Sequence, residues 1–118
     1  HRLKTGALIK AAVLAGAYCA APSQREIYAL STFAEKFGLL FQVTDDILDV
    51  EGEAASLGKS IGKDESERKL TSVSRFGLDG AKALARQTAA EAAEALQIFG
   101  ERARFLSGLT EMTLTRKV

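Results

Sequence analysis

The sequence is poor in residues that interrupt or cross-link a chain. Among its 118 residues there are one cysteine, one proline and no tryptophan. A single cysteine, Cys19, excludes an internal disulfide and fits a reducing compartment, so we expect a cytoplasmic protein. Because Cys19 lies in an alanine-rich run, we interpret it as a small core residue. With so little proline and little strand signal, helices are the expected structure.

The sequence also lacks an excess of one charge and any long apolar run. The formal net charge is +1, which does not favour bulk attraction to nucleic acid, so we expect no nucleic-acid partner. The apolar stretch 11–21 is far shorter than the roughly 20 residues that a membrane-spanning helix needs, so we expect no stable membrane insertion. No signal peptide is visible, and the chain does not begin with methionine. We therefore expect a fragment or a processed chain.

The residues that are abundant are good helix formers. Alanine, leucine and glutamate are the most frequent of them, and lysine and glutamine add to them, which predicts an all-α fold with a single domain over residues 1–118. Ser23 and Glu26, directly after Pro22, form a helix start signal. The apolar spacing and the glycines predict about five helices, at residues 3–20, 23–50, 67–76, 80–99 and 101–115. We expect Phe105 and Met112 on the packed, apolar side of the last of these helices. A glycine-containing loop is expected at 52–65.

Three carboxylates stand within five residues of an otherwise apolar run: Asp45, Asp46 and Asp49. Because side chains at i, i+3 and i+4 of a helix lie beside one another, we expect one anionic cluster with no neighbouring cation in the sequence. Near the C-terminal end of a helix, carboxylates oppose the helix dipole, so capping does not explain them. Carboxylates suit Mg²⁺, which is usually held by few protein groups plus phosphates. The pattern predicts Mg²⁺ and a phosphorylated ligand, and the alternative is a solvated helix end.

Together with three other segments, the aspartate segment resembles the C-terminal half of the trans-type isoprenyl diphosphate synthases. The likeness is closest to the bacterial farnesyl diphosphate synthases (geranyltranstransferases). The matching segments, in chain order, are Lys4-Thr5-Gly6, then Phe41-Gln42 followed by Asp45-Asp46-Ile47-Leu48-Asp49, then Gly58-Lys59 with Gly62-Lys63-Asp64, and finally Lys69-Leu70-Thr71 with Gly77-Leu78-Asp79-Gly80-Ala81. A DDxxD sequence alone is a weak signal, but these four segments in this order cover essentially the whole chain.

The resemblance implies an isoprenoid-synthase-type helical bundle and a Mg²⁺-dependent prenyltransferase. Members of the family join an allylic diphosphate, such as dimethylallyl or geranyl diphosphate, to isopentenyl diphosphate and release pyrophosphate. Two aspartate-rich motifs hold the Mg²⁺ ions, and the leaving group departs in a dry cavity. By this likeness Asp45 would bind Mg²⁺ directly. Asp46 and Asp49 would support it, either through water molecules on the metal or by holding the direct ligands in place.

The resemblance also assigns roles to single residues outside the aspartates. Lys4, Lys59 and Lys69 would contact the allylic diphosphate as point charges. The spacing leaves open whether Lys63 or Arg68 takes the place of Lys69, and each lysine has an ordinary surface role as its alternative.

Three further residues are assigned to the reacting end of the substrate. Thr5 and Gln42 would position the diphosphate or stabilise the cation beside the reacting carbons, and Phe41 would line the apolar pocket of the prenyl chain. The alternatives are a threonine that bonds back to its own helix and a core amide.

One departure from the family is large. The family's first aspartate-rich motif, and the arginines and histidine that hold isopentenyl diphosphate, precede the Lys-Thr pair and have no counterpart here. We therefore expect the full-length parent protein to be an enzyme, and we expect this part of it to be inactive alone. We also expect a homodimer or a self-associating fragment. The alternatives are a non-catalytic Mg²⁺–diphosphate-binding or regulatory module derived from the family, and a related terpene cyclase, which the Lys-Thr pair and the glycine-lysine loop disfavour.

Overall fold

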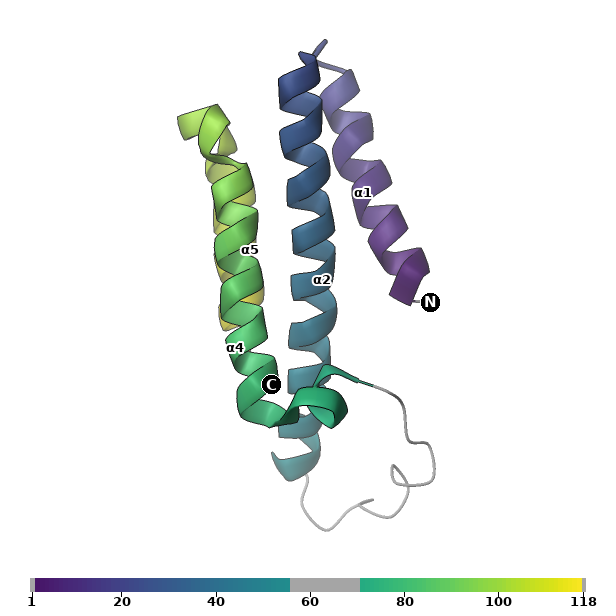
Figure 1. The fold of residues 1–118 in the computed structure, drawn as a ribbon, viewed down its shortest axis with the longest axis vertical. Coiled ribbons are helices and arrows are strands. Elements are labelled where there is room, and N and C mark those ends of the chain that lie inside the picture. The colour runs from purple at the N-terminus through teal and green to yellow at the C-terminus, as the bar shows by residue number, and fades with distance from the viewer. Residues whose placement is uncertain (1, 56–70, 118) are drawn as a thin grey trace.

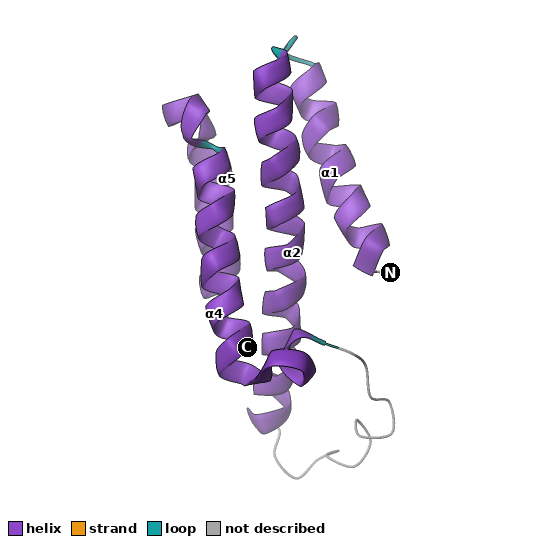
Figure 2. Cartoon of the chain, viewed as in Figure 1, coloured by secondary structure: helices purple, strands orange, loops and turns teal. Residues whose placement is uncertain are grey.

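The chain was analysed as a computed structural model that describes residues 2–55 and 71–117. Its helices are α1 (Arg2–Tyr18), α2 (Gln24–Ala55), α4 (Ser72–Ala95) and α5 (Arg104–Thr115), and a 3₁₀ helix, η1 (Gln97–Ala103), precedes α5 (Figure 1). All regular structure in these two ranges is helical (Figure 2). The all-α prediction is confirmed, although the described residues form four α-helices where about five were expected.

The helix boundaries differ from the expected ones at three glycines. Gly77 has φ +76° and ψ 167°, but it produces a kink inside α4 and not the gap expected between two helices. Gly100, with φ +55°, lies inside η1, so the last segment becomes α-helical only from Arg104. Gly52 does not end α2, which continues to Ala55. The aspartates therefore lie further inside their helix than the sequence indicated.

Side-chain capping fixes where two of the helices begin. At the start of α2, Ser23 Oγ accepts from Glu26 N at 3.1 Å, and Glu26 Oε1 accepts from Ser23 N at 2.9 Å. This reciprocal pair satisfies two backbone donors and confirms the predicted start signal. An equivalent pair joins Thr71 and Ser74 at the start of α4, with bonds of 3.0 and 2.8 Å. The beginning of α4 is thus fixed next to the aspartate segment.

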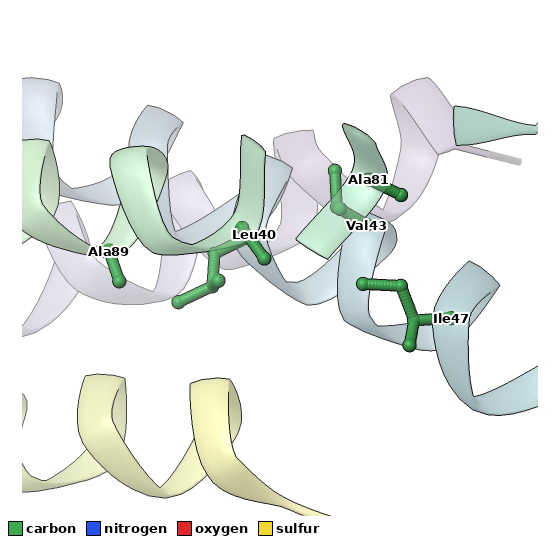
Figure 3. Packing of buried hydrophobic residues seen from close by; sticks show 6 residues of the cluster. Leu40, Val43, Ile47, Ala81 and Ala89 are labelled. Carbon is green, nitrogen blue, oxygen red and sulfur yellow. The ribbon is translucent and has the colours of Figure 1, made fainter. Parts of the chain in front are cut away.

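Helix α2 lies between α1 on one side and α4 with α5 on the other (Figure 1). Its buried Leu40, Val43 and Ile47 face the alanines of α4, which include Ala81 and Ala89 (Figure 3). Small side chains on α4 allow the two helices to pack closely, so large apolar residues are needed on one helix only. A second cluster around Phe33 and Phe37 continues this core toward the start of α2. The aspartate segment is therefore held by a firmly packed helix.

Two predictions about the core are wrong. Cys19 is exposed in the turn after α1, where its thiol donates to Ala15 O at 3.4 Å. The side chains of Phe105 and Met112 on α5 are 76% and 61% exposed, because Leu106, Leu109 and Leu114 form the packed side of that helix. In the part of the chain that the structure describes, no helix is both long and apolar enough to cross a membrane.

Candidate functional site

The aspartate segment does not present its carboxylates on one surface. Asp45 and Asp49 are exposed, whereas Asp46 is buried with 5% exposure. Successive residues of a helix are about 100° apart, so Asp46 can face the packed side while Asp45 and Asp49 face outward. The expected single cluster of three aspartates is therefore divided into an outward pair and one buried carboxylate.

Asp46 connects α2 to the beginning of α4. Its Oδ2 accepts a hydrogen bond of 2.9 Å from the backbone N of Ser72, the first residue of α4. The first N–H groups of a helix have no partner within the helix and carry partial positive charge, so a carboxylate there is stabilised. Asp46 therefore has a structural task that its place in the sequence motif did not indicate.

Asp45 has a cationic neighbour, Arg116, that lies 71 residues further along the chain. The Nη2 of Arg116 is 3.3 Å from Asp45 Oδ1, 2.9 Å from Thr44 Oγ1 and 3.2 Å from Phe41 O. The guanidinium carbon lies 4.7 Å from the centroid of the Phe41 ring. The expectation that the aspartates have no cation beside them is wrong, because the fold brings one from the end of α5.

Sequence reasoning missed Arg116 because nothing local connects it to the aspartates. Arg116 follows α5 directly in an extended conformation, with φ −62° and ψ 150°. The only available signal was the basic pair Arg116-Lys117 near the end of the sequence. Without a fold, such a pair is indistinguishable from an ordinary solvated terminus.

The aspartate segment offers oxygen donors, which are the ligands that Mg²⁺ prefers. Within residues 2–55 and 71–117, no three histidine, cysteine, aspartate or glutamate side chains are grouped closely enough to hold a metal ion. The exposed pair Asp45 and Asp49, four residues apart on α2, offers carboxylate oxygens on adjacent turns. Mg²⁺ usually takes one or two carboxylates and completes its octahedron with water and phosphate oxygens. The pair fits that chemistry, provided that a phosphorylated ligand supplies further oxygens.

Helix α1 brings the Lys-Thr pair toward the same region. α1 and α2 run antiparallel, and a Cβ on Gly38 would lie 3.5 Å from Gly6 Cα (Figure 1). A Cβ on Gly6 would lie 4.0 Å from Gln42 Nε2. Residues before Gly6 are level with residues after Gly38, so Lys4 and Thr5 are level with residues 40 and 39. At a rise of about 1.5 Å per residue, Asp45 lies about 7.5–9 Å further along the axis, between one and two turns away.

The other residues expected at the site are only partly gathered there. Gln42 is half-buried and lines a cavity of about 340 Å³ between α1 and α2, together with Gly6 and Lys10. Phe41 is half-buried under Arg116 and lines neither this cavity nor the larger one described next. Lys59 and Lys69, like their rivals Lys63 and Arg68, lie outside the described residues.

A larger cavity of about 620 Å³ lies between α2, α4 and the end of α5. Apolar side chains that include Ile47, Leu48 and Leu114 line it, and basic residues that include Arg86 and Arg116 stand beside them. It therefore lies next to Asp45, on the side of α2 that faces α4 and α5.

Comparisons with known proteins agree with this arrangement. A family model described as polyprenyl synthetase matches residues 1–104. The chain is 44% identical over 110 residues to the farnesyl diphosphate synthase of Escherichia coli strain K12, covering 92% of this chain and 37% of that protein. It is 36% identical over 116 residues to the geranylgeranyl diphosphate synthase of Cyanophora paradoxa, covering 98% and 39%.

The fold is also similar to a solved one. A crystal structure assigned as a farnesyl-diphosphate synthase from Marinomonas sp. MED121 superposes with a TM-score of 0.76 at 33% identity, covering 94% of this chain and 36% of that one. The chain thus spans between a third and two fifths of the length of these relatives.

Proposed function

Because this chain belongs to the polyprenyl synthetase family, we propose that it carries one part of a Mg²⁺-dependent prenyltransferase site. The complete protein would join an allylic diphosphate to isopentenyl diphosphate and release pyrophosphate. The observation that carries this proposal is the antiparallel packing of α1 on α2, which brings Lys4 and Thr5 toward the level of Asp45. A cation and a hydroxyl on α1 and a carboxylate on α2 would then serve the same part of the helix pair, as an ionising diphosphate requires.

The outward carboxylates of α2 would hold the metal. Asp45 and Asp49 would provide oxygens to Mg²⁺, which neutralises the charge of the departing diphosphate. Asp46 would support them indirectly, since its hydrogen bond to Ser72 N fixes the position of α2 against α4.

The α1 side would position the substrate. Lys4 would contact the diphosphate as a point charge, joined by Lys59 and Lys69 from outside the described residues. Gln42 and Thr5 would orient the reacting end, because each offers a polar atom near the crossing of α1 and α2. Phe41 would face the prenyl chain once the remaining part of the enzyme completes the pocket.

The proposal is tested by restoring the missing part. The chain is mixed with, or fused to, the segment of the Escherichia coli relative that precedes the matched region. Pyrophosphate release from dimethylallyl and isopentenyl diphosphates is then followed with and without Mg²⁺. We expect Mg²⁺-dependent turnover, lowered at least about a hundredfold by Asp45→Ala and unchanged by Glu94→Ala, an exposed acid on α4. A fully active Asp45→Ala variant would contradict the assignment.

A second candidate is a non-catalytic Mg²⁺–diphosphate-binding or regulatory module. The observation that favours it is the division of the aspartates, in which Asp46 is held at Ser72 N and only Asp45 and Asp49 face outward. Calorimetry with Mg²⁺ and a non-hydrolysable allylic diphosphate distinguishes the two. Binding by this chain with no turnover in the restored complex would favour the module, whereas binding that is unchanged in Asp45→Ala and Lys4→Ala would remove the site from both proposals.

A further inference from the structure

Arg116 is held mainly by groups other than Asp45. Its Nη2 carries two hydrogens but faces three acceptors, and the shortest contacts are to Thr44 Oγ1 at 2.9 Å and Phe41 O at 3.2 Å. The contact with Asp45 Oδ1 is the longest, at 3.3 Å. The Phe41 ring lies against the guanidinium with a separation of 4.7 Å from its centroid. The cation would therefore stay in place if Asp45 turned to another partner.

The exposure of the two side chains supports this asymmetry. The Arg116 side chain is 29% exposed, whereas the Asp45 side chain is 58% exposed. Thr44, which shares the guanidinium, is buried and also donates its hydroxyl to Leu40 O at 2.9 Å. The guanidinium of Arg116 is thus fixed on the packed side of α2, whereas the carboxylate of Asp45 is free to change its orientation.

From this geometry we infer that Arg116 is a positioning residue for Asp45 that sets how tightly the carboxylate binds a divalent cation. The inference rests on the proposed function, which places Mg²⁺ at Asp45. The ion pair uses Oδ1 of Asp45, so Oδ2 would be the oxygen available to the metal. A fixed positive charge beside the carboxylate weakens its attraction for Mg²⁺ alone, because the two cations repel each other.

This weakening has a use in the proposed reaction. A site that binds bare Mg²⁺ weakly takes the metal mainly together with a diphosphate, whose negative charge offsets both cations. Arg116 would in this way couple occupation of Asp45 to the arrival of substrate. The contact is partly exposed, so solvent screens it and the effect is modest.

The test compares three variants in the chain as it stands. Mg²⁺ affinity is measured by calorimetry for wild type, Arg116→Gln, Arg116→Lys and the control Arg86→Gln, which removes an exposed charge beside the same 620 Å³ cavity. We expect Arg116→Gln to bind Mg²⁺ about two- to fivefold more tightly, and the other two variants to match wild type. Thermal unfolding of each variant verifies that it is folded.

The outcomes separate this inference from the function on which it rests. A gain of affinity is not what local unfolding produces, so tighter binding in Arg116→Gln alone supports the role. Unchanged or weaker binding in a folded Arg116→Gln overturns it. If Arg116→Gln does not fold, Phe41→Leu takes its place, because it removes the ring that lies against the guanidinium. A Mg²⁺ affinity about two- to fivefold tighter in Phe41→Leu than in wild type then supports the role of Arg116. Equal affinities overturn it. Absence of Mg²⁺ binding by wild type both alone and with pyrophosphate present removes the metal from Asp45 and so overturns the proposed function as well.

Discussion

At the scale of single residues, neighbouring aspartates on α2 have different surroundings and therefore different expected tasks. Asp46 is buried and accepts from Ser72 N, whereas Asp45 is exposed and pairs with Arg116. A buried acceptor that is removed leaves its donor unsatisfied, while an exposed ion pair contributes little to stability. Substitution of Asp46 should thus lower stability, whereas substitution of Asp45 should mainly affect metal binding.

The first prediction concerns the stability of variants at these positions. Asp46→Ala should lower the free energy of unfolding by about 1–3 kcal/mol, because Ser72 N loses its partner. Asp45→Ala should lower it by less than about 1 kcal/mol. Urea unfolding followed by circular dichroism measures both. Asp46→Asn, which keeps an acceptor oxygen, serves as the control, and equal losses in the two alanine variants would contradict the assignment.

The second prediction concerns Glu26, where the capping pair makes stability depend on pH. The hydrogen bond from Ser23 N, followed by the one from Arg102, lowers the pKa of Glu26 below its ordinary value of 4.5. A lowered folded pKa stabilises the protein above the unfolded pKa, and this stability is lost as the pH falls through the folded value. Glu26→Gln keeps an acceptor oxygen but removes the charge.

The measurement for Glu26 is thermal unfolding between about pH 6 and about pH 3. Wild type should lose more stability than Glu26→Gln as the pH falls. The difference should develop below the ordinary Glu pKa of 4.5, as the pH approaches the lower pKa of the folded state. Glu94→Gln, at an exposed position on α4, is the matched control. Parallel curves for wild type and Glu26→Gln would show that the capping carboxylate does not titrate differently on folding.

At the scale of elements, the kink in α4 depends on one glycine. Gly77 combines φ +76° with ψ 167°, a conformation that residues with a Cβ strongly disfavour. The kink lets the short first part of α4 lie across the end of α2, where Asp46 reaches Ser72 (Figure 1). Backbone freedom at one position thus serves the anchoring of the aspartate segment.

The third prediction compares two glycine substitutions. Gly77→Ala should lower the free energy of unfolding by about 1–3 kcal/mol, through backbone strain alone, since no atom lies within 4 Å of the added Cβ. Gly108→Ala, in the middle of α5 and also with open space at its Cβ, should raise it by about 0.5–1 kcal/mol. Chemical denaturation measures both, and a neutral Gly77→Ala would mean that the kink relaxes without cost.

At the scale of the whole molecule, the chain is more elongated than a compact domain. Its radius of gyration is 16.2 Å and its extents are 53 × 23 × 20 Å, whereas a compact domain of this length would have a radius of gyration of about 13–14 Å. α1 packs mainly against α2, and its Leu3, Leu8 and Tyr18 are 91%, 69% and 64% exposed. Apolar side chains exposed along one helix favour association.

The fourth prediction is that the chain associates with itself in solution. Sedimentation velocity should show an average mass that rises with concentration, because burying the apolar side of α1 is favourable. Leu8→Glu, which places a charge on that side, should shift the distribution toward monomer, while Gln87→Glu at an exposed position of α4 should not. A monomer at all concentrations would contradict the expectation.

The sequence by itself determined the helical class, the start of α2 and the segments that identify the family. Capping at Ser23 and Glu26 and the apolar spacing of α2 are local properties, which a short stretch of sequence records completely. The predicted burial of Phe105 was wrong, because burial depends on which helices pack together. Within the described residues there are four α-helices where about five were expected, because Gly77 kinks α4 and does not end it.

Only the tertiary structure decided which aspartate faces which partner. Asp46 turned inward to the start of α4, and Arg116 came to Asp45 from 71 residues away. Contacts between residues far apart in the chain depend on the packing of complete helices, which no local pattern encodes. The DDxxD pattern therefore predicted the chemistry of the segment, and the fold buried Asp46 against the start of α4 while it left Asp45 and Asp49 exposed.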